Sequence, residues 1–305
     1  MLKYLIIQLD DTSTSFCHYS NNKSNRNLIP YDVLKEGIFW AMKENLLVQF
    51  VYPSFELPEE YVLLIDTIEH IDVVSSNKSG DVVVCDSIEA LENLSKEQDG
   101  SIIVRISFAD FIEGVDRLGG YGALNIVITD IENIHADSLE EYRKAVEKLA
   151  LAIHNGYLRG RRSVVNIVTD RIHLNEMNNC NAGVESVTLA PDGNFYLCPG
   201  FYLEGEEPIG SLQDGIKIKN QNLLTLAHAP ICRTCDAYQC KRCILLNKKL
   251  THELNTPGKQ QCVMAHHERN ASRLLLEKLK GISKAFDEFD IPEIDFLDPF
   301  ENIKR

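Results

Sequence analysis

The chain has 305 residues, of which 44% are hydrophobic and 25% charged, a balance typical of one large folded domain or two smaller ones. Its formal net charge of −14 argues against broad binding to nucleic acid or to an anionic membrane, because both require a basic face. No apolar run reaches the ~20 residues that span a membrane, and the first residues show no secretory signal pattern. We therefore expect a cytoplasmic protein.

Strand-like and helix-like segments alternate through the first half of the chain. Short apolar or β-branched runs predict strands at residues 3–9, 47–52, 61–65, 81–85, 102–106, 124–128 and 164–168. Apolar residues at helical spacing predict helices at residues 30–44, 88–96, 108–117 and 138–155. Strands that alternate with helices favour a parallel sheet, so the expected fold class is α/β, open or partly closed as a barrel.

The pattern changes from about residue 174, where glycine, asparagine, proline and cysteine become frequent. Residues 187–197 predict a small hairpin with Pro191, Asp192 and Gly193 as its turn. A helix is predicted for residues 264–285, and the acidic and aromatic tail after it is either disordered or an arm docked on the body. We expect an α/β domain at residues 1–173, a cysteine-rich metal-binding domain at 174–263, and a C-terminal helix and tail at 264–305.

The chain has nine cysteines, and we do not expect them to form disulfides, because the cytoplasm is a reducing compartment. Cys17 and Cys85 stand apart, and the other seven lie between Cys180 and Cys262, a clustering that favours metal ligation. Two Cys-x-x-Cys pairs occur within twelve residues, and each pair lets two thiolates reach one metal from a tight turn. The pairs form the pattern C-x2-C-x4-C-x2-C, with Cys232, Cys235, Cys240 and Cys243.

The spacing of the cysteines leaves the identity of the metal open. Four thiolates suit zinc or an iron–sulfur cluster equally by ligand chemistry. Seven cysteines fit poorly with zinc, which takes sets of four, whereas they fit two clusters if one position is open or filled by another ligand. His173 is a candidate for that further ligand, and an ordinary surface histidine is the alternative.

The run from Cys180 to Cys262 resembles the SPASM domain, the auxiliary-cluster domain of radical SAM peptide-modifying enzymes. Gly193 and Cys198 keep the family's G-x4-C element, while the central cysteine run is one residue shorter in each of its last two gaps. The resemblance implies two [4Fe–4S] clusters. It assigns one cluster to Cys180, Cys198 and Cys243, and the other to Cys232, Cys235, Cys240 and Cys262.

The first motif of a radical SAM enzyme, C-x3-C-x2-C after the first strand, is degenerate in this chain. Its three positions hold Ser13, Cys17 and Ser20. One thiolate cannot hold that cluster, and serine hydroxyls are poor ligands for it. The glycine-rich G-G-E-P stretch expected after the second strand is replaced by FVYPSFE at residues 50–56. We therefore expect a partial parallel (βα) barrel of the radical SAM type without S-adenosylmethionine chemistry. Cys17 and His18 are its candidate catalytic residues, and a buried relic is the alternative for Cys17.

A narrower resemblance covers most of the chain. The stretches LDDTSTSFCHYSN, AMKENLLVQFVYP, CKRCILLNKKLTHELNTPGKQQC and HHERNASRLLL resemble the CXXX repeat peptide maturases. That resemblance implies a cysteine-rich precursor peptide as partner, together with a separate, intact radical SAM maturase. Three functions stay open: a peptide-modifying protein, a non-catalytic partner that presents the precursor, and a zinc-stapled interaction module.

One feature of the last stretch admits two interpretations. His266 and Asn270 are four residues apart, so they share one face of the predicted final helix. They either contact a substrate or cluster beside Cys262, or they only pack a helix N-terminus on the cysteine-rich region, which is the interpretation we favour.

Overall fold

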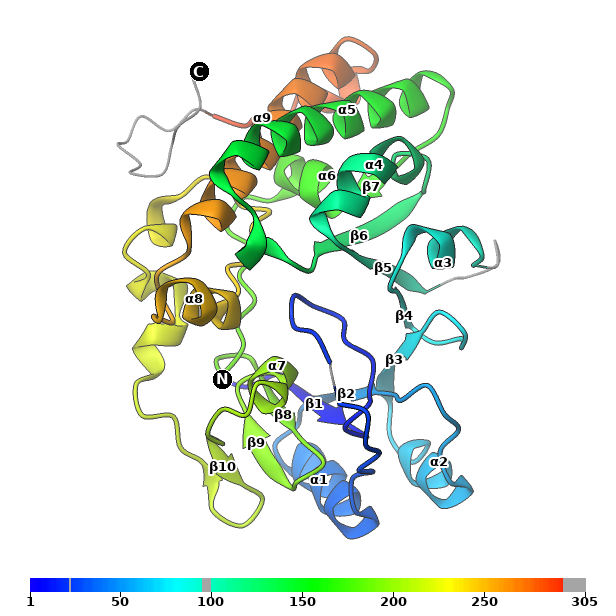
Figure 1. Cartoon of the computed structure of the whole chain (residues 1–305), viewed down its shortest axis with the longest axis vertical. Coiled ribbons are helices and arrows are strands. Elements are labelled where there is room, and N and C mark those ends of the chain that lie inside the picture. Colours follow the sequence, from blue (N-terminus) through cyan, green and yellow to red (C-terminus); the bar gives the residue numbers. More distant parts are fainter. Residues whose placement is uncertain (22, 95–99, 293–305) are drawn as a thin grey trace. The chain divides into compact units, whose positions relative to one another are not determined.

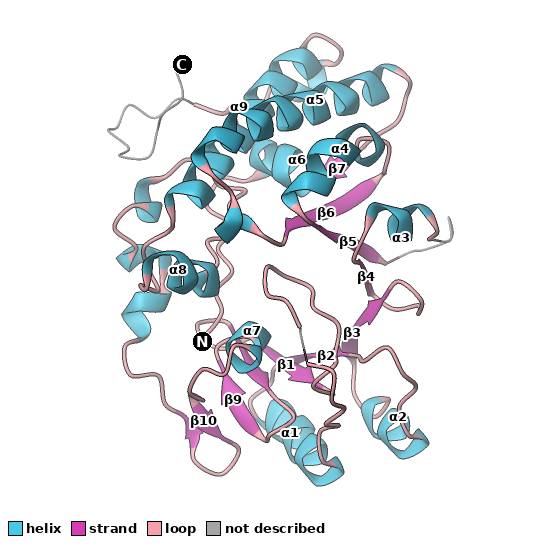
Figure 2. Ribbon diagram, viewed as in Figure 1, coloured by secondary structure: helices cyan, strands magenta, loops and turns pink. Residues whose placement is uncertain are grey.

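The computed structural model describes residues 1–21, 23–94 and 100–292, and it divides into two compact units (Figures 1 and 2). Each unit collects segments that lie far apart in the sequence. Unit 1 comprises Met1–Cys85, Asn93–Ser101 and Asn181–Thr225. Unit 2 comprises Asp86–Glu92, Ile102–Cys180 and Leu226–Arg305. The predicted domain boundaries at residues 173 and 263 describe a different division and stay a prediction.

Unit 1 is built on a mixed sheet with the strand order β11-β10-β9-β8-β1-β2-β3-β4. Strands β8, β1, β2, β3 and β4 run parallel, and β9, β10 and β11 continue the sheet as antiparallel hairpins. The strands are β1 (Tyr4–Gln8), β2 (Leu47–Val51), β3 (His70–Ser75), β4 (Val82–Cys85), β8 (Ser186–Leu189), β9 (Asn194–Tyr196), β10 (Gly210–Ser211) and β11 (Gly215–Ile216). Its helices are α1 (Tyr31–Lys43), α2 (Glu59–Ile65) and α7 (Pro199–Leu203).

The core of unit 1 lies between α1 and one face of the sheet. Leu5 and Ile7 of β1 pack there with Leu34 and Ile38 of α1. Helix α1 approaches β8 closely at Gly37, where an added Cβ would stand 2.4 Å from the Leu189 Cδ2 atom. A larger residue at Gly37 would therefore require the Leu189 side chain to move.

Unit 2 combines three parallel strands with most of the helices. The strands are β5 (Ser101–Ile106), β6 (Ala123–Ile128) and β7 (Val164–Val165). The helices are α3 (Ile88–Glu92), α4 (Phe108–Leu118), α5 (Leu139–Leu158), α6 (Asn166–His173), α8 (Ile244–Thr251) and α9 (Lys259–Lys280). Helix α9 packs along α5 and α6 and connects these helices within the unit (Figure 1).

Most of the predicted elements are confirmed, and the errors have local causes. Residues 61–65, predicted as a strand, belong to helix α2, where Pro58 precedes the first turn and Glu59 and Glu60 favour its N-terminus. Tyr61 and Ile65 then lie on one buried face at helical spacing. The predicted strand at residues 164–168 ends at residue 165, and α6 follows. The prediction missed strand β3 because His70 and Asp72 interrupt its apolar pattern.

Helix α9 begins at Lys259 rather than near residue 264, which brings Cys262 into its first turn. The tail is docked as far as the described residues reach, since Phe286 packs on Tyr157 and Phe289 packs on His173. The rest of the predicted tail, residues 293–305, lies outside the described part of the chain. No helix in that described part is long and apolar enough to cross a membrane.

Candidate metal centre

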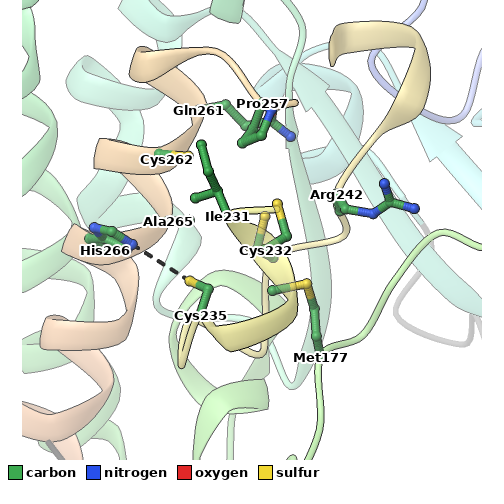
Figure 3. Close-up of a pocket in the computed structure, with 11 residues that line it drawn as sticks. Met177, Ile231, Cys232, Cys235, Arg242, Pro257, Gln261, Cys262, Ala265 and His266 are labelled. Carbon is green, nitrogen blue, oxygen red and sulfur yellow. Dashed lines mark hydrogen bonds between the residues drawn. The ribbon is translucent and has the colours of Figure 1, made fainter. Parts of the chain in front are cut away.

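Four of the predicted ligand cysteines line one pocket in unit 2 (Figure 3). Cys232 opens a short 3-10 helix, Cys232–Thr234, and Cys235 follows it directly. Cys240 lies in the turn before α8, and Cys262 lies in the first turn of α9. The remaining lining residues are Met177, Ile231, Arg242, Pro257, Gln261, Ala265 and His266. The structure thus collects these four cysteines from separate segments around a single cavity.

Backbone turns hold the pocket cysteines in place. The Cys235 N–H donates to the Cys232 carbonyl at 3.2 Å, which closes the first Cys-x-x-Cys turn. The Ala237 N–H donates to the Cys235 sulfur at 3.4 Å, and the Cys240 N–H donates to the Ala237 carbonyl at 3.0 Å. Such turns expose two sulfurs on the same side of the chain, as a metal site requires.

A second cysteine pair in unit 2 joins Cys243 of the cysteine-rich turn with Cys180 of the neighbouring segment. The chain around Cys180 runs beside the cysteine-rich turn, because the Cys180 N–H donates to the Lys241 carbonyl at 2.9 Å and the Asn178 N–H donates to the Tyr238 carbonyl at 2.8 Å. Burial, and then the nearby Cys180, raises the pKa of the Cys243 thiol to about 12. Cys180 and Cys243 therefore lie within electrostatic reach of each other.

Cys198, the third predicted ligand of that set, belongs to unit 1. It is half-buried and occupies the N-cap position of helix α7. Its grouping with Cys180 and Cys243 stays a prediction. His173 packs edge-on against the ring of Phe289, with 4.9 Å between the ring centroids, and it does not line the pocket.

The pocket is suited to a thiolate-binding group by the chemistry of its donors. Burial raises the pKa of the Cys240 thiol well above its usual range, and the neighbouring Cys232 and Cys235 raise it further. Cys240 is therefore protonated when free, and a bound metal must displace its proton. Cys235, Cys240 and Cys262 are each half-buried, and all three line the cavity.

The spacing of the donors bears on which metal group fits. Among the described residues, no three Cys, His, Asp or Glu side chains converge closely enough to hold one metal ion. A single zinc would need four ligands at about 2.3 Å from one point. A cluster binds each thiolate through a different iron, so its ligands surround a volume rather than a point.

His266 enters the pocket, although the sequence favoured a packing role for it. Its Nε2 atom lies 3.6 Å from the Cys235 sulfur, and the side chain is 1% exposed (Figure 3). The signal that could have identified His266 is its distance of one helical turn from Cys262, once α9 is known to begin at Lys259.

A buried ionic network fixes the cysteine turn to the helices behind it, and the sequence did not identify Asp236 or Arg171 as members of it. Asp236, which follows Cys235, is 1% exposed, and its two carboxylate oxygens accept hydrogen bonds from Arg269 at 2.6 Å and from Arg273 at 2.8 Å. Arg171 of α6 donates to the Asp236 carbonyl at 2.6 Å. The backbone beside Cys235 is therefore held by charged groups from both α6 and α9.

Beside this network, Glu268 of α9 carries a perturbed carboxyl group. Burial raises the pKa of Glu268 to about 7, although hydrogen bonds from Tyr142 at 2.6 Å and Gln239 at 3.2 Å favour the charged form. Glu268 therefore titrates close to neutral pH, unlike an ordinary surface glutamate.

The degenerate first motif lies in unit 1, in the loop after β1. Ser13 is 2% exposed, and its hydroxyl donates to the Val51 carbonyl at 2.8 Å while it accepts from the Asp10 N–H at 3.0 Å. Ser20 is exposed, and Cys17 and His18 are half-buried. Ser13 therefore ties the loop to the end of β2 instead of facing a common ligand with Cys17.

Three further side chains hold the same loop, and sequence reasoning missed them. The Tyr202 hydroxyl of α7 donates to the Asp11 carboxylate. The Lys23 ammonium lies 3.4 Å from that carboxylate and 3.8 Å from the centre of the Tyr202 ring. Since Cys198 caps α7, this contact connects the loop to the helix that carries one of the predicted cluster ligands.

Solved structures with a similar fold exist. A histidine-tagged anSMEcpe with bound AdoMet matches with a TM-score of 0.64 and 14% identity, over 94% of this chain and 97% of that one. Native anSMEcpe with bound AdoMet and Cp18Cys peptide matches with a TM-score of 0.62 and 12% identity, over 92% and 100%. Streptococcus suis SuiB bound to S-adenosylmethionine matches with a TM-score of 0.48 and 10% identity, over 86% of this chain and 75% of that one.

No protein-family model and no curated protein sequence matches the chain. Sequence identities this low establish the fold alone. The predicted fold class, α/β with parallel strands of the radical SAM type, is confirmed by the anSMEcpe structures.

Proposed function

We propose that this protein takes part in the maturation of a ribosomally made precursor peptide with CXXX repeats, and that it binds two auxiliary [4Fe–4S] clusters. The observation that carries the proposal is the pocket formed by Cys232, Cys235, Cys240 and Cys262. The fold supports it, because anSMEcpe, which shares that fold, has been solved with bound AdoMet and the Cp18Cys peptide. The cysteine repeats of the precursor are taken from the family resemblance.

In this proposal the four pocket cysteines hold one cluster, and Cys180, Cys198 and Cys243 hold the other. The second set has three cysteines, so one iron would be left open to a thiolate of the substrate. A bound cluster supplies electron transfer or an iron site for such a thiolate. The role of the chain's own residues is to present the sulfurs, and the Asp236 network keeps the turn that carries Cys235 in place.

S-adenosylmethionine chemistry is not part of the proposal. The radical SAM cluster needs three thiolates from the first loop, and this chain offers Cys17 alone. The Ser13 hydroxyl donates a hydrogen bond to the Val51 carbonyl and accepts one from the Asp10 N–H, so this side chain stabilises the loop. Cys17 and His18 keep their place as candidate catalytic residues.

A second candidate function is a non-catalytic partner, which binds the precursor and presents it to a separate radical SAM maturase. The hydrogen bond from Ser13 to Val51 favours this alternative, because the loop then has a structural role and not a cluster-binding one. A third candidate is a zinc-stapled interaction module, which the cysteine content also fits. In each case we propose a cytoplasmic protein that binds neither nucleic acid nor membrane.

The first experiment is anaerobic purification, followed by measurement of iron, sulfide and zinc per chain. Roughly eight irons with matching sulfide, the content of two [4Fe–4S] clusters, would support the proposal. One or two zinc ions without sulfide would refute it and leave the interaction module.

A second experiment separates the maturase from the partner. The precursor is incubated with this protein, with the separate radical SAM enzyme, and with both, and its mass is then measured. Modification by this protein alone would refute the non-catalytic role, whereas modification only by both together would support it.

A further inference from the structure

Arg242 is a buried charge placed within the cysteine-rich turn, between Cys240 and Cys243. It is 1% exposed and is among the largest fully buried side chains of the described chain. Guanidinium stays protonated at any ordinary pH, so a full positive charge is removed from water here. Such burial is costly unless negative charge compensates for it.

The position of Arg242 relates it to both predicted ligand sets. Its residue lines the pocket with Cys232 and Cys240, and its side chain leads away from that pocket (Figure 3). Its Nε atom donates to the Asn179 side-chain oxygen at 2.7 Å, next to Cys180. Arg242 therefore lines one predicted site, while its guanidinium lies next to a residue of the other.

The charge of Arg242 also interacts with cysteines of both predicted ligand sets. Burial lowers the pKa of Arg242, and the cysteines whose charge would oppose that effect are Cys232, Cys180, Cys240 and Cys243. Two of these belong to each predicted ligand set. A cysteine that binds a metal group does so as a thiolate, so each of the four carries negative charge when it serves as a ligand.

The backbone at Arg242 is also unusual. Its φ angle is 30°, in the left-handed region that side chains with a Cβ rarely adopt. Glycine would fit this turn without strain. A residue with a Cβ is therefore held here at a cost in backbone strain.

We propose that Arg242 is a positioning residue that serves as a shared counter-charge for the two cysteine sites when both carry thiolate-bound clusters. This inference rests on the proposed function. A cluster with its thiolates carries net negative charge and becomes more negative on reduction. A fixed cation between the two sites favours their loading, and it favours the reduced state of each cluster.

The test compares two variants of the full chain, purified anaerobically. R242Q removes the charge but can keep a hydrogen bond to Asn179, and R242K keeps a charge. The readouts are iron and sulfide per chain and the reduction potential of each cluster, followed by absorption and electron paramagnetic resonance. The control is R105M, which removes another buried arginine of unit 2, one whose partner at 2.5 Å is Asp86.

We expect R242Q to shift both reduction potentials to more negative values, while R242K and R105M stay close to the wild type. Loss of iron in R242Q with retention in R242K would equally support a requirement for charge. Equal behaviour of R242Q and R242K, whether both lose iron, both shift or neither shifts, would overturn the inference. A wild-type protein without iron and sulfide would instead refute the proposed function, so the two failures are distinguishable.

Discussion

The carboxylate of Asp236 is the anion on which the cysteine turn depends, because it accepts hydrogen bonds from two guanidinium groups of α9. Asp236 is 1% exposed and Arg269 is 6% exposed, so water screens their interaction poorly. The substitution D236N keeps the size of the side chain but deprives Arg269 and Arg273 of this charge partner.

Breaking a buried ion pair on one side costs roughly 3–5 kcal/mol. Arg273 is 19% exposed at its side chain and recovers part of its solvation, so the lower half of that range is expected, about 3 kcal/mol. In a protein of this size that corresponds to a fall in melting temperature of roughly 6–12 °C. The reason is the lost charge compensation of buried Arg269 rather than lost packing.

The assay is denaturant unfolding of wild type and D236N, followed by circular dichroism, with and without a chelator in the buffer. The matched control is D116N, which breaks the exposed pair of Asp116 and Lys148 at 2.6 Å and should cost less than about 1 kcal/mol. If D236N is no more destabilising than D116N, the network does not hold the turn, and the reasoning from its burial is wrong.

Three further predictions concern single side chains. C262S should lower the iron content by about half, because one of two clusters loses a ligand, whereas C17S should leave it unchanged; iron and sulfide assays measure both. S13A removes the hydrogen bond to Val51 and should lower the free energy of unfolding by about 1–3 kcal/mol, with unchanged iron content as the check that Ser13 is no ligand. Because the pKa of Glu268 is raised by burial from 4.5 to about 7, the folded state holds a proton that the unfolded state has lost between these values. Wild-type stability should therefore fall by up to about 3 kcal/mol relative to E268Q from pH 4.5 to pH 7 and level off above it, as unfolding curves across pH would show; parallel curves for the two proteins would contradict the burial of this carboxyl.

The sequence predicted those features that depend on local pattern. Residues 30–44 read correctly as a helix because Leu34 and Ile38 repeat at its period, and both lie in the core of unit 1. The hairpin around Gly193 could be predicted because its turn needs a residue with positive φ, which glycine adopts readily, and Gly193 has a φ of 81°. Cysteine spacing likewise identified which sulfurs could share one turn.

Other features depend on which segments meet in space, and no local pattern encodes them. The placement of His266 beside Cys235 depends on where α9 begins. Nothing in the sequence pairs the charges of Asp236 and Arg269, and only packing buries them together.

The same holds for the degenerate loop and for the cysteine turn. The sequence identified Ser13 as a lost ligand, but its hydrogen bond to Val51 requires the parallel pairing of β1 with β2. Arg242 is one of 31 basic residues in the sequence, and folding alone makes it a buried cation between two sets of cysteines. Residue spacing along the chain thus determined which donors exist. The tertiary structure decided which of them meet, because burial and charge compensation arise only when distant segments pack together.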